Sequence, residues 1–548
     1  MKKEQNKGIT LVALVITIIV LLILAGVTIS SLAGDNGILA RAAEAKRKTI
    51  EAQKEEEKTI KDLEYYASNI ENVSTYNPST KVNEPQLATG MTRIMFDASN
   101  NVIKEDNPTF QKDGWYNYSE KKWANMQTED GSMWVWIPRF AYQIKPDSTV
   151  DVKFLIGTSD NYYISDTETG TAKRQKTVDE VIDTTQGYTV HPAFTNESSI
   201  GFKNGGWDKE LSGIWVAKFE AGYVNKELEK DQIKASSVYY SQGTVWGNKA
   251  ETDNKTEDGS ISARNYLDGV YGAKKTAIKY PVFKGSTNEI PRYSMNYINH
   301  NDAFNISRAL TEANNPYGLS ARTDSHLMKN SEWGATAYLG KSQYGLNGQA
   351  VETNNKNVNN NPTSAYAQPG YDYSKDSTDP WNQWNKVDAP KTASASGTVY
   401  GVFDMAGGTW ERTAAYINNP VGQPQRNAYG KSIAKAGDIS TKYTTVYPFD
   451  KGVDKSGASD YTVTSKANYA VNNVKSGIYG DAVRETSTDG VGATSWDSDY
   501  SYFPALDLPF FARGGGSWSG YDAGLLAFYR NSGSSSYYYG FRPVLVVL

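Results

Sequence analysis

The chain has 548 residues and no cysteine, and 57 Lys and Arg against 61 Asp and Glu give a net charge of −4. The missing cysteine excludes disulfide bonds, thiolate metal sites and a cysteine nucleophile, and the near-balance of charge gives no electrostatic reason to expect a nucleic-acid partner. A hydrophobic share of 39% fits a folded protein, and 38 Tyr beside 47 Gly favour an exposed binding surface.

A basic leader, residues 1–8, precedes an uncharged stretch, residues 9–34. Its most apolar part, residues 9–29, forms a helix long enough for a bilayer core of about 30 Å. The basic side stays cytoplasmic, so the bulk of the chain is expected outside the cell membrane, at the cell surface. A cleaved secretory signal or a plain membrane anchor stays an alternative, although no small-residue cleavage site follows the stretch.

The boundary between leader and helix reads Lys7-Gly8-Ile9-Thr10-Leu11 and resembles a type IV prepilin signal. The resemblance implies a prepilin peptidase that cuts between Gly8 and Ile9, a place in a type IV pilus and other pilins as partners. Ala13 departs from the pattern, because pilins carry a glutamate at that position. The departure favours a minor or tip pilin and leaves open whether the chain polymerises or stays an anchored monomer.

Residues 35–70 follow as a charged helical stalk, after Gly34 and Gly37 interrupt the first helix. Seven basic and seven acidic side chains lie between residues 41 and 64, and Glu44 with Lys48 forms a favourable i,i+4 pair. Such a helix acts as a solvated spacer. We expect residues 71–114 to connect it to a large head.

The head, residues 115–548, alternates short apolar stretches with Gly, Asn, Asp, Ser and Pro. The pattern predicts strands at residues 133–137, 152–156, 214–219 and 544–548. Two stretches rich in turn residues, 341–396 and 417–500, are predicted to be long surface loop insertions.

Five motifs then occur in a fixed order. They are MWVWIPR from Met133, LSGIWVAKFE from Leu211, DSHLMKNSEW from Asp324 with a predicted helix to Tyr338, GVFDMAGGTWE from Gly401, and RGGGSW from Arg513 with GFRPV from Gly540. Their order resembles the formylglycine-generating-enzyme-like branch of the C-type lectin fold. The resemblance implies an α+β protein, in which the long N-terminal helix is followed by a C-type-lectin-like, ligand-binding domain over residues 115–548.

The residue types in these motifs are typical of a structural scaffold. Buried Trp needs a partner for its ring N–H, Gly allows close backbone approach, and Arg513 and Arg542 can pin the two ends of the last segment by multidentate hydrogen bonds. The expected scaffold residues are Trp410, Arg513, Gly514, Trp518, Phe541 and Arg542.

The sequence predicts no enzyme, no catalytic residue, no cofactor and no metal. Catalytic members of the resembled family use a cysteine pair, which this chain lacks. His191, His300 and His326 are isolated from one another in sequence, and we expect His326 to be a packed residue of a helix. Two remote alternatives are a Ca²⁺ site among the loop carboxylates and an enzyme of an undescribed kind.

The segment from Arg513 to Gly540 holds seven Gly, six Ser and five Tyr. Its composition is that of a paratope, in which Tyr gives contact area at low entropy cost and Ser or Gly gives adaptable fit. An ordinary low-complexity loop is the alternative.

The same segment resembles the variable region of proteins diversified by diversity-generating retroelements, in which Asn codons of a template become Tyr, Ser, Asp and other residues on a C-type lectin frame. The positions that this resemblance implies to be variable and ligand-binding are Ser519, Tyr521, Asp522, Leu525, Tyr529, Arg530, Asn531, Ser532, Ser534, Ser535, Ser536, Tyr537, Tyr538 and Tyr539.

We therefore expect a surface-displayed, pilin-like adhesin or receptor-binding protein. It would bind an unknown surface ligand, protein or glycan, through its Tyr/Ser/Gly-rich C-terminal surface. The alternative is a structural minor pilin without a dedicated ligand.

Overall fold

The structure, a computed structural model, describes residues 15–21, 41–42, 44–50, 52–53, 56–57, 60, 76–175, 180, 182–196, 204–222, 281–285, 295, 298–352, 393–419, 423–448, 465, 468–470, 478–505, 507–516, 519, 522–534 and 539–548. The chain divides into two compact units, Met1–Ala67 and Ser68–Leu548. Their described residues form a mixed α+β protein with many strands and few helices.

The first unit is helical where it is described. Residues 15–21 expose their apolar side chains, from 46% for Val15 to 60% for Leu21. Glu44 and Lys48 lie 2.9 Å apart, which confirms the predicted i,i+4 pair. Within the described residues, no helix is both long enough and apolar enough to cross a bilayer. The expected cleavage site, Gly8 and Ile9, and most of the expected span at residues 9–29 lie outside the described residues.

The largest sheet of the second unit has seven antiparallel strands. In spatial order they are β13 (Thr323–Leu327), β19 (Pro543–Val547), β12 (Gly213–Ala217), β6 (Met133–Pro138), β5 (Asn125–Thr128), β3 (Met91–Phe96) and β4 (Val102–Lys104). The C-terminal strand β19 thus lies between strands from the middle of the chain, which places the last segment inside the frame.

A second sheet of five strands carries the Tyr-rich segment. Its order is β15 (Thr445–Tyr447), β14 (Trp410–Ile417), β16 (Phe510–Gly514) and β17 (Gly524–Asn531), and β18 (Tyr539–Phe541) pairs with β14. Three smaller sheets contain β1 (Tyr76–Asn77), β2 (Val82–Asn83), β7 (Phe140–Ile144), β8 (Val150–Phe154), β9 (Asn161–Tyr163), β10 (Thr169–Thr171) and β11 (Thr189–Val190).

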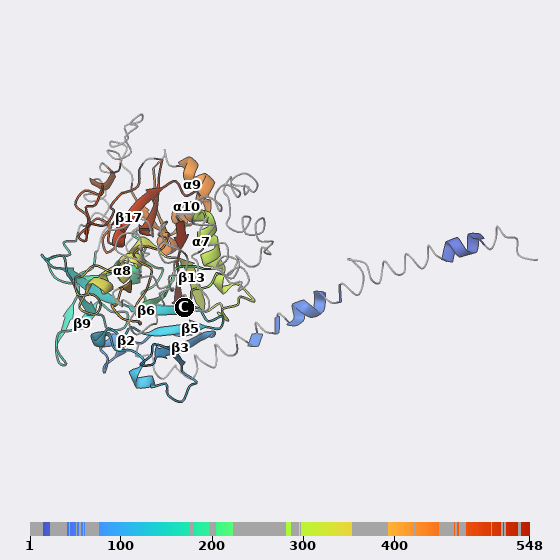
Figure 1. Ribbon diagram of the computed structural model, residues 1–548, viewed down its shortest axis with the longest axis horizontal. Helices are drawn as coiled ribbons and strands as arrows, with labels where there is room; N and C mark the ends of the chain where they lie inside the picture. The colour runs from blue at the N-terminus through green and yellow to red at the C-terminus, as the bar shows by residue number, and fades with distance from the viewer. Residues whose placement is uncertain are drawn as a thin grey trace, which may run out of the picture. The chain divides into compact units, whose positions relative to one another are not determined.

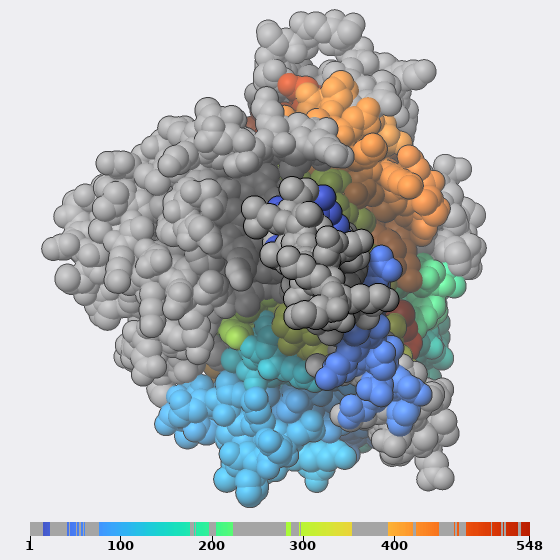
Figure 2. Space-filling view, turned by 90° about the vertical axis from the view of Figure 1, so that its right-hand side faces the viewer, coloured from blue at the N-terminus to red at the C-terminus, as the bar shows by residue number. Residues whose placement is uncertain are grey.

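Among the described residues of this unit, the α-helices that pack around these sheets are α7 (His300–Arg308), α8 (Asn330–Lys341), α9 (Gln423–Tyr429) and α10 (Lys431–Ile439). In Figure 1, β3 and β5 lie in blue shades at the opposite end of this unit from α9 and α10, which are orange, and Figure 2 likewise shows the light-blue and the orange atoms at opposite ends of the view. Buried Trp134, Trp136 and Trp215 fill the core of the large sheet, with the rings of Trp136 and Trp215 centred 5.2 Å apart.

Strand predictions at four positions are confirmed with shifts of one or two residues, as β6, β8, β12 and β19. The prediction of a helix around His326 is wrong, because Thr323–Leu327 pairs with β19 and places His326 opposite Val544. The helix begins only at Asn330.

The predicted connector and one predicted loop insertion also belong to the folded body. Residues 71–114, expected to be a connector, contribute β3 and β4 to the large sheet. Residues 417–500, expected to be a surface loop, contain α9, α10 and β15 and bury the carboxylates of Asp481 and Glu485. Tyrosine hydroxyls compensate those carboxylates, since Tyr447 donates to Asp481 and Tyr142 donates to Glu485. Turn-rich composition therefore did not distinguish a packed segment from a solvated one.

Candidate functional site

The candidate site is a cluster of aromatic side chains on one face of the five-stranded sheet. Successive side chains of a strand point to opposite faces, and the register aligns Arg412, Ala512 and Tyr529 in one row across β14, β16 and β17. The neighbouring row, Glu411, Arg513 and Phe528, points the other way, and Phe528 packs there in a buried apolar cluster. Tyr529 is thereby turned away from that core.

We call the cluster the aromatic face: Trp410, Tyr500, Tyr502, Tyr529 and Tyr539. Tyr529 is central, with its ring centroid 5.3 Å from that of Trp410, 5.6 Å from Tyr502 and 5.9 Å from Tyr500. The four tyrosines are half-buried, and Trp410 is 6% exposed. Such side chains combine contact area with polar tips, as binding surfaces require.

Small residues make room for these rings. Ala512 and Ala527 are fully buried in the same cluster as Trp410, and the half-buried Tyr529 and Tyr539 pack against that cluster. A larger side chain at either position would fill the space that the rings occupy. The sheet therefore supplies a floor of small side chains on which the aromatic groups lie.

Tyr500 and Tyr502 were not predicted from the sequence. Both lie outside the 513–542 segment: Tyr500 is the last residue of the stretch 417–500 that was expected to be a surface loop, and Tyr502 follows that stretch. Their spacing of two residues is the available signal, because alternate residues of an extended segment share a face. Burial raises the pKa of Tyr500, and Tyr502 and Asp522 add to this effect, so the phenol is neutral at pH 7.

The fully buried side chain of Arg412 lies under one end of the aromatic face. Its guanidinium stacks on the ring of Tyr539 at 4.4 Å and donates to Asn531 Oδ1 at 2.9 Å, to the carbonyl of Ile298 at 2.8 Å and to the carbonyl of Ser534. Burial lowers the pKa of Arg412 to about 9, so the group stays charged at pH 7. Arg412 therefore ties Asn531, Ser534 and Tyr539 to the frame.

The same guanidinium assigns the tautomer of His300. Arginine only donates, so His300 Nδ1, 2.7 Å from Arg412 Nη1, must accept. The proton then sits on Nε2, which donates to the carbonyl of Thr413 at 3.2 Å. Burial and the charge of Arg412 lower the pKa of His300, in agreement with a neutral ring.

The predicted contact residues fall into three groups. Seven are described and at least partly accessible: Ser519, Asp522, Tyr529, Arg530, Ser532, Ser534 and Tyr539. Five lie outside the described residues: Tyr521, Ser535, Ser536, Tyr537 and Tyr538.

The remaining two, Leu525 and Asn531, are corrections. Leu525 is 0% exposed and belongs to the main apolar core, and Asn531 is 4% exposed and accepts from Arg412. An apolar side chain in the core and a polar one committed to Arg412 cannot touch a ligand in this conformation, so both belong to the frame.

Replacing Asn531 by Ala should destabilise the protein by about 2 kcal/mol, because Arg412 Nη1 and the N–H of Gly533 each lose a buried acceptor at 2.9 Å. The measurement is the free energy of unfolding in urea. Ser532→Ala is the control and should cost less than about 1 kcal/mol, since its hydroxyl pairs with Ser534 in a partly buried position. Equal costs for the two variants would show that Asn531 is not part of the frame.

The two scaffold arginines pin the ends of the Tyr-rich segment as expected. Arg513 donates to the carbonyls of Asp481, Ala482 and Ala527, each at 2.9 Å. Arg542 forms a two-pronged pair with Glu411, at 2.7 and 2.5 Å. Gly514 ends β16, and Trp410 and Phe541 are buried, whereas Trp518 lies outside the described residues.

The three histidines serve packing and capping. His326 is buried between Asp324 Oδ1 at 3.1 Å and Glu332 Oε1 at 2.8 Å. His191 Nδ1 accepts from the N–H of Ala193, and burial lowers the pKa of His191 to about 3. Within the described ranges, no group of three His, Asp or Glu side chains is arranged to hold a metal ion.

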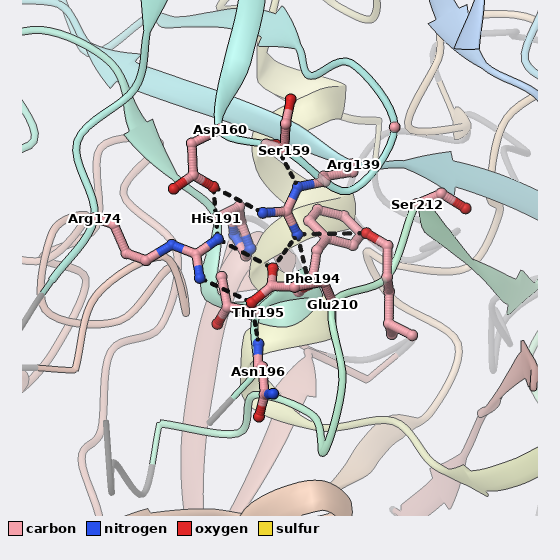
Figure 3. A network of polar contacts seen from close by, with 12 residues as sticks. Arg139, Ser159, Asp160, Arg174, His191, Phe194, Thr195, Asn196, Glu210 and Ser212 are labelled. Carbon is pink, nitrogen blue, oxygen red and sulfur yellow. Dashed lines mark hydrogen bonds and ion pairs between the residues drawn. The ribbon is translucent and has the colours of Figure 1, made fainter. Parts of the chain in front are cut away.

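Separate from the aromatic face, a network of charged side chains lies near β7 (Figure 3). The buried Arg139 bonds to Asp160 at 2.9 Å and to Glu210 at 2.8 Å, and Arg174 bonds to the same two carboxylates at 2.5 and 2.8 Å. Two cations and two anions thus alternate and compensate one another. Arg139 also donates to the carbonyl of Phe194 at 2.7 Å, which makes the network a structural clamp.

Comparison of the chain with protein-family models and with curated proteins finds no match. The geometry of the aromatic face therefore carries the functional conclusion.

Proposed function

We propose that this chain is a surface-displayed binding protein whose aromatic face contacts the ligand. The observation that carries the proposal is the arrangement around Tyr529, where half-buried tyrosines from three chain segments meet on a sheet whose other face is core. Arg412 and the neighbouring alanines hold these rings in place. A rigid floor under aromatic groups lowers the entropy cost of binding.

We also propose that the head has a C-type-lectin-like fold and that a pilin-type N-terminus anchors it. The order of the five sequence motifs and the pinning of both ends of the last segment support the first proposal. The uncharged stretch after Gly8 and the exposed apolar side chains of residues 15–21 support the proposal of a pilin-type anchor. Moving such side chains from water into a bilayer or against other apolar helices lowers the free energy.

The binding proposal is tested with the full chain in detergent micelles. An array of immobilised glycans and a phage-displayed random peptide library serve as probes. The double variant Tyr529→Ala with Tyr539→Ala should weaken the strongest interaction about tenfold or more, because central aromatic residues dominate binding energies. Surface plasmon resonance measures the change.

A tyrosine pair on another surface is the matched control. Tyr162 and Tyr188 are also half-buried, with ring centroids 5.1 Å apart, and β9 lies well away from β17 in Figure 1. The variant Tyr162→Ala with Tyr188→Ala should bind like the unmutated chain. If the two double variants behave alike, or if neither probe set yields an interaction, the structural minor pilin becomes the better proposal.

Diversification of the segment is tested separately on DNA. A near-repeat of the codons for residues 513–542 that differs at adenines, beside a reverse-transcriptase gene, would support it. The absence of such a repeat from the surrounding genome would contradict diversification and leave the binding proposal standing.

A further inference from the structure

Residues 499–502, which we call the edge segment, pair with the edge of β17 that β16 does not occupy. The N–H of Tyr500 donates to the carbonyl of Asp522 at 2.9 Å. The N–H of Phe528 donates to the carbonyl of Tyr500, and the N–H of Tyr502 donates to the carbonyl of Phe528, both also at 2.9 Å. This pairing holds the rings of Tyr500 and Tyr502 at 5.9 and 5.6 Å from that of Tyr529. The two rings therefore belong to the aromatic face only while the edge segment is attached.

The carboxyl group of Asp499 forms the first attachment of the edge segment. Its Oδ2 accepts the N–H of Leu526 at 3.0 Å, and Asp499 is 3% exposed. A Cβ on Gly524 would lie 2.2 and 2.3 Å from the two carboxyl oxygens, so the group rests directly on the main chain of β17. Ser498, the residue before it, has a φ of +65°, in the left-handed region that favours glycine. Attachments farther along the chain hold this turn, since the residue itself does not favour it.

The charged groups around Asp499 are engaged elsewhere. Lys341, at the end of α8, bonds to Asp497 at 2.7 Å and to a main-chain carbonyl at 2.6 Å. Arg513, on β16, donates to three main-chain carbonyls. Asp497, on the same loop, has the same charge as an ionised Asp499, and β17 faces the group with a glycine and a main-chain N–H, neither of which titrates. Burial and Asp497 raise the pKa of Asp499 to about 7, against the smaller opposing effects of that N–H, Lys341 and Arg513.

We propose that Asp499 is a pH-sensitive latch, which holds Tyr500 and Tyr502 against β17 in acid and releases them as its carboxyl group ionises. An ionised group in the attached segment lies in a buried site, whereas water solvates the charge once the segment opens. The latch is a property of the fold and does not require that the aromatic face bind a ligand. Failure of the latch therefore leaves the proposed function standing, and the reverse also holds.

The direction of the effect follows from the proton that the attached segment retains. The pKa of Asp499 is about 7 when the segment is attached, and it returns to the ordinary 3.8 when water surrounds the group. Between these two values opening releases a proton, so the equilibrium constant for opening rises with pH. The rise is roughly fiftyfold from pH 5 to pH 7 and levels off above pH 7.

Hydrogen–deuterium exchange of the full chain in detergent micelles tests the latch at pH 5, 6, 7 and 8. Each rate is divided by the intrinsic rate at that pH and read residue by residue by mass spectrometry. The reporters are the four amides that donate across the attachment, those of Tyr500, Tyr502, Leu526 and Phe528. Amides of β12, in the large sheet, report on global unfolding. We expect the four reporters to open more often than β12 and their opening constant to rise roughly fiftyfold from pH 5 to pH 7.

Three single substitutions sharpen the test. Asp499→Asn keeps an oxygen for the N–H of Leu526 but carries no charge, so its four reporters should have the same opening constant at every pH. Asp497→Asn removes the like charge that raises the pKa of Asp499, so the rise should be complete at a lower pH. Asp97→Asn is the matched control on an exposed turn and should behave like the unmutated chain.

One opening constant shared by the four reporters and β12 at pH 8 would overturn the latch, because the edge segment would then open only when the whole unit unfolds. Reporters whose opening does not change with pH in the unmutated chain would overturn it as well. So would a pH dependence that survives in Asp499→Asn, since another group would then be responsible.

Discussion

Replacing Arg542 by Met should destabilise the protein by about 3–5 kcal/mol, one of the largest effects expected from a single substitution in this chain. Arg542 is fully buried and bonds to both oxygens of Glu411, and it also donates to the carbonyls of Ala217 at 2.9 Å and Phe403 at 2.8 Å. Methionine fills much of the volume but leaves Glu411 without its counter-charge. Burial already raises the pKa of Glu411, against the opposing effect of Arg542.

The free energy of unfolding in urea measures the loss, and Arg93→Met is the matched control. Arg93 pairs with Glu105 at 2.9 Å, but the two side chains are 23% and 35% exposed. Solvent screens such a pair, so its loss should cost about 1 kcal/mol or less. Similar costs for the two arginines would mean that Arg542 does not pin the last segment to β14.

Replacing Asp499 by Asn should remove a pH dependence of stability near neutrality. Burial raises the pKa of Asp499 from its ordinary 3.8 to about 7, and the nearby Asp497 adds to the rise, whereas Lys341 and Arg513 oppose it. Lys341 is occupied by Asp497, 2.7 Å away. The carboxyl group is thus held protonated in the folded state over a range where it is ionised in the unfolded chain.

The sign of the effect follows from proton binding. Between pH 4 and 7 the folded state binds a proton that the unfolded state has released, so this group's contribution to stability falls as the pH rises through that window. The full loss at pH 8 is roughly 4 kcal/mol relative to acidic solution. The amide that Asp499→Asn introduces carries no charge at any pH, so the variant should be more stable than the unmutated protein at pH 8.

Urea unfolding at pH 5, 6, 7 and 8 checks this expectation through the difference between the two proteins. Asp97→Asn is the control, because hydrogen bonds from Asn101 lower the pKa of Asp97, whose carboxylate is ionised throughout this range. Its difference from the unmutated protein should not change between pH 6 and 8. A parallel pH dependence of Asp499→Asn and the unmutated protein would contradict a raised pKa at Asp499.

Local patterns in the sequence predicted those features that depend on neighbouring residues. The strands at 133–137 and 214–219 are short apolar runs between turn residues, and they became β6 and β12 with small shifts. Arg513 and Arg542 were expected to pin the last segment because arginine beside glycine and tryptophan suits multidentate bonding, and both do.

Features that depend on distant pairing were missed. Nothing near His326 indicates that β19, more than two hundred residues later, would hold its segment as a strand. Asn531 reads as a polar, exposed residue until Arg412 is placed beneath it. Tyr500 belongs to the aromatic face only because its main chain pairs with β17. Sheet partners and buried counter-charges are properties of the assembled fold.

The alternation along β17 limits the kinds of genetic change that this surface tolerates. Tyr529 faces outward and Phe528 faces the core, because adjacent residues of the strand point to opposite sides. Inserting or deleting one codon between residues 526 and 530 would exchange these roles, burying a tyrosine and exposing a phenylalanine. Substituting an outward-facing residue such as Tyr529 leaves this alternation unchanged, so the strand tolerates a change of residue type there better than a change of length.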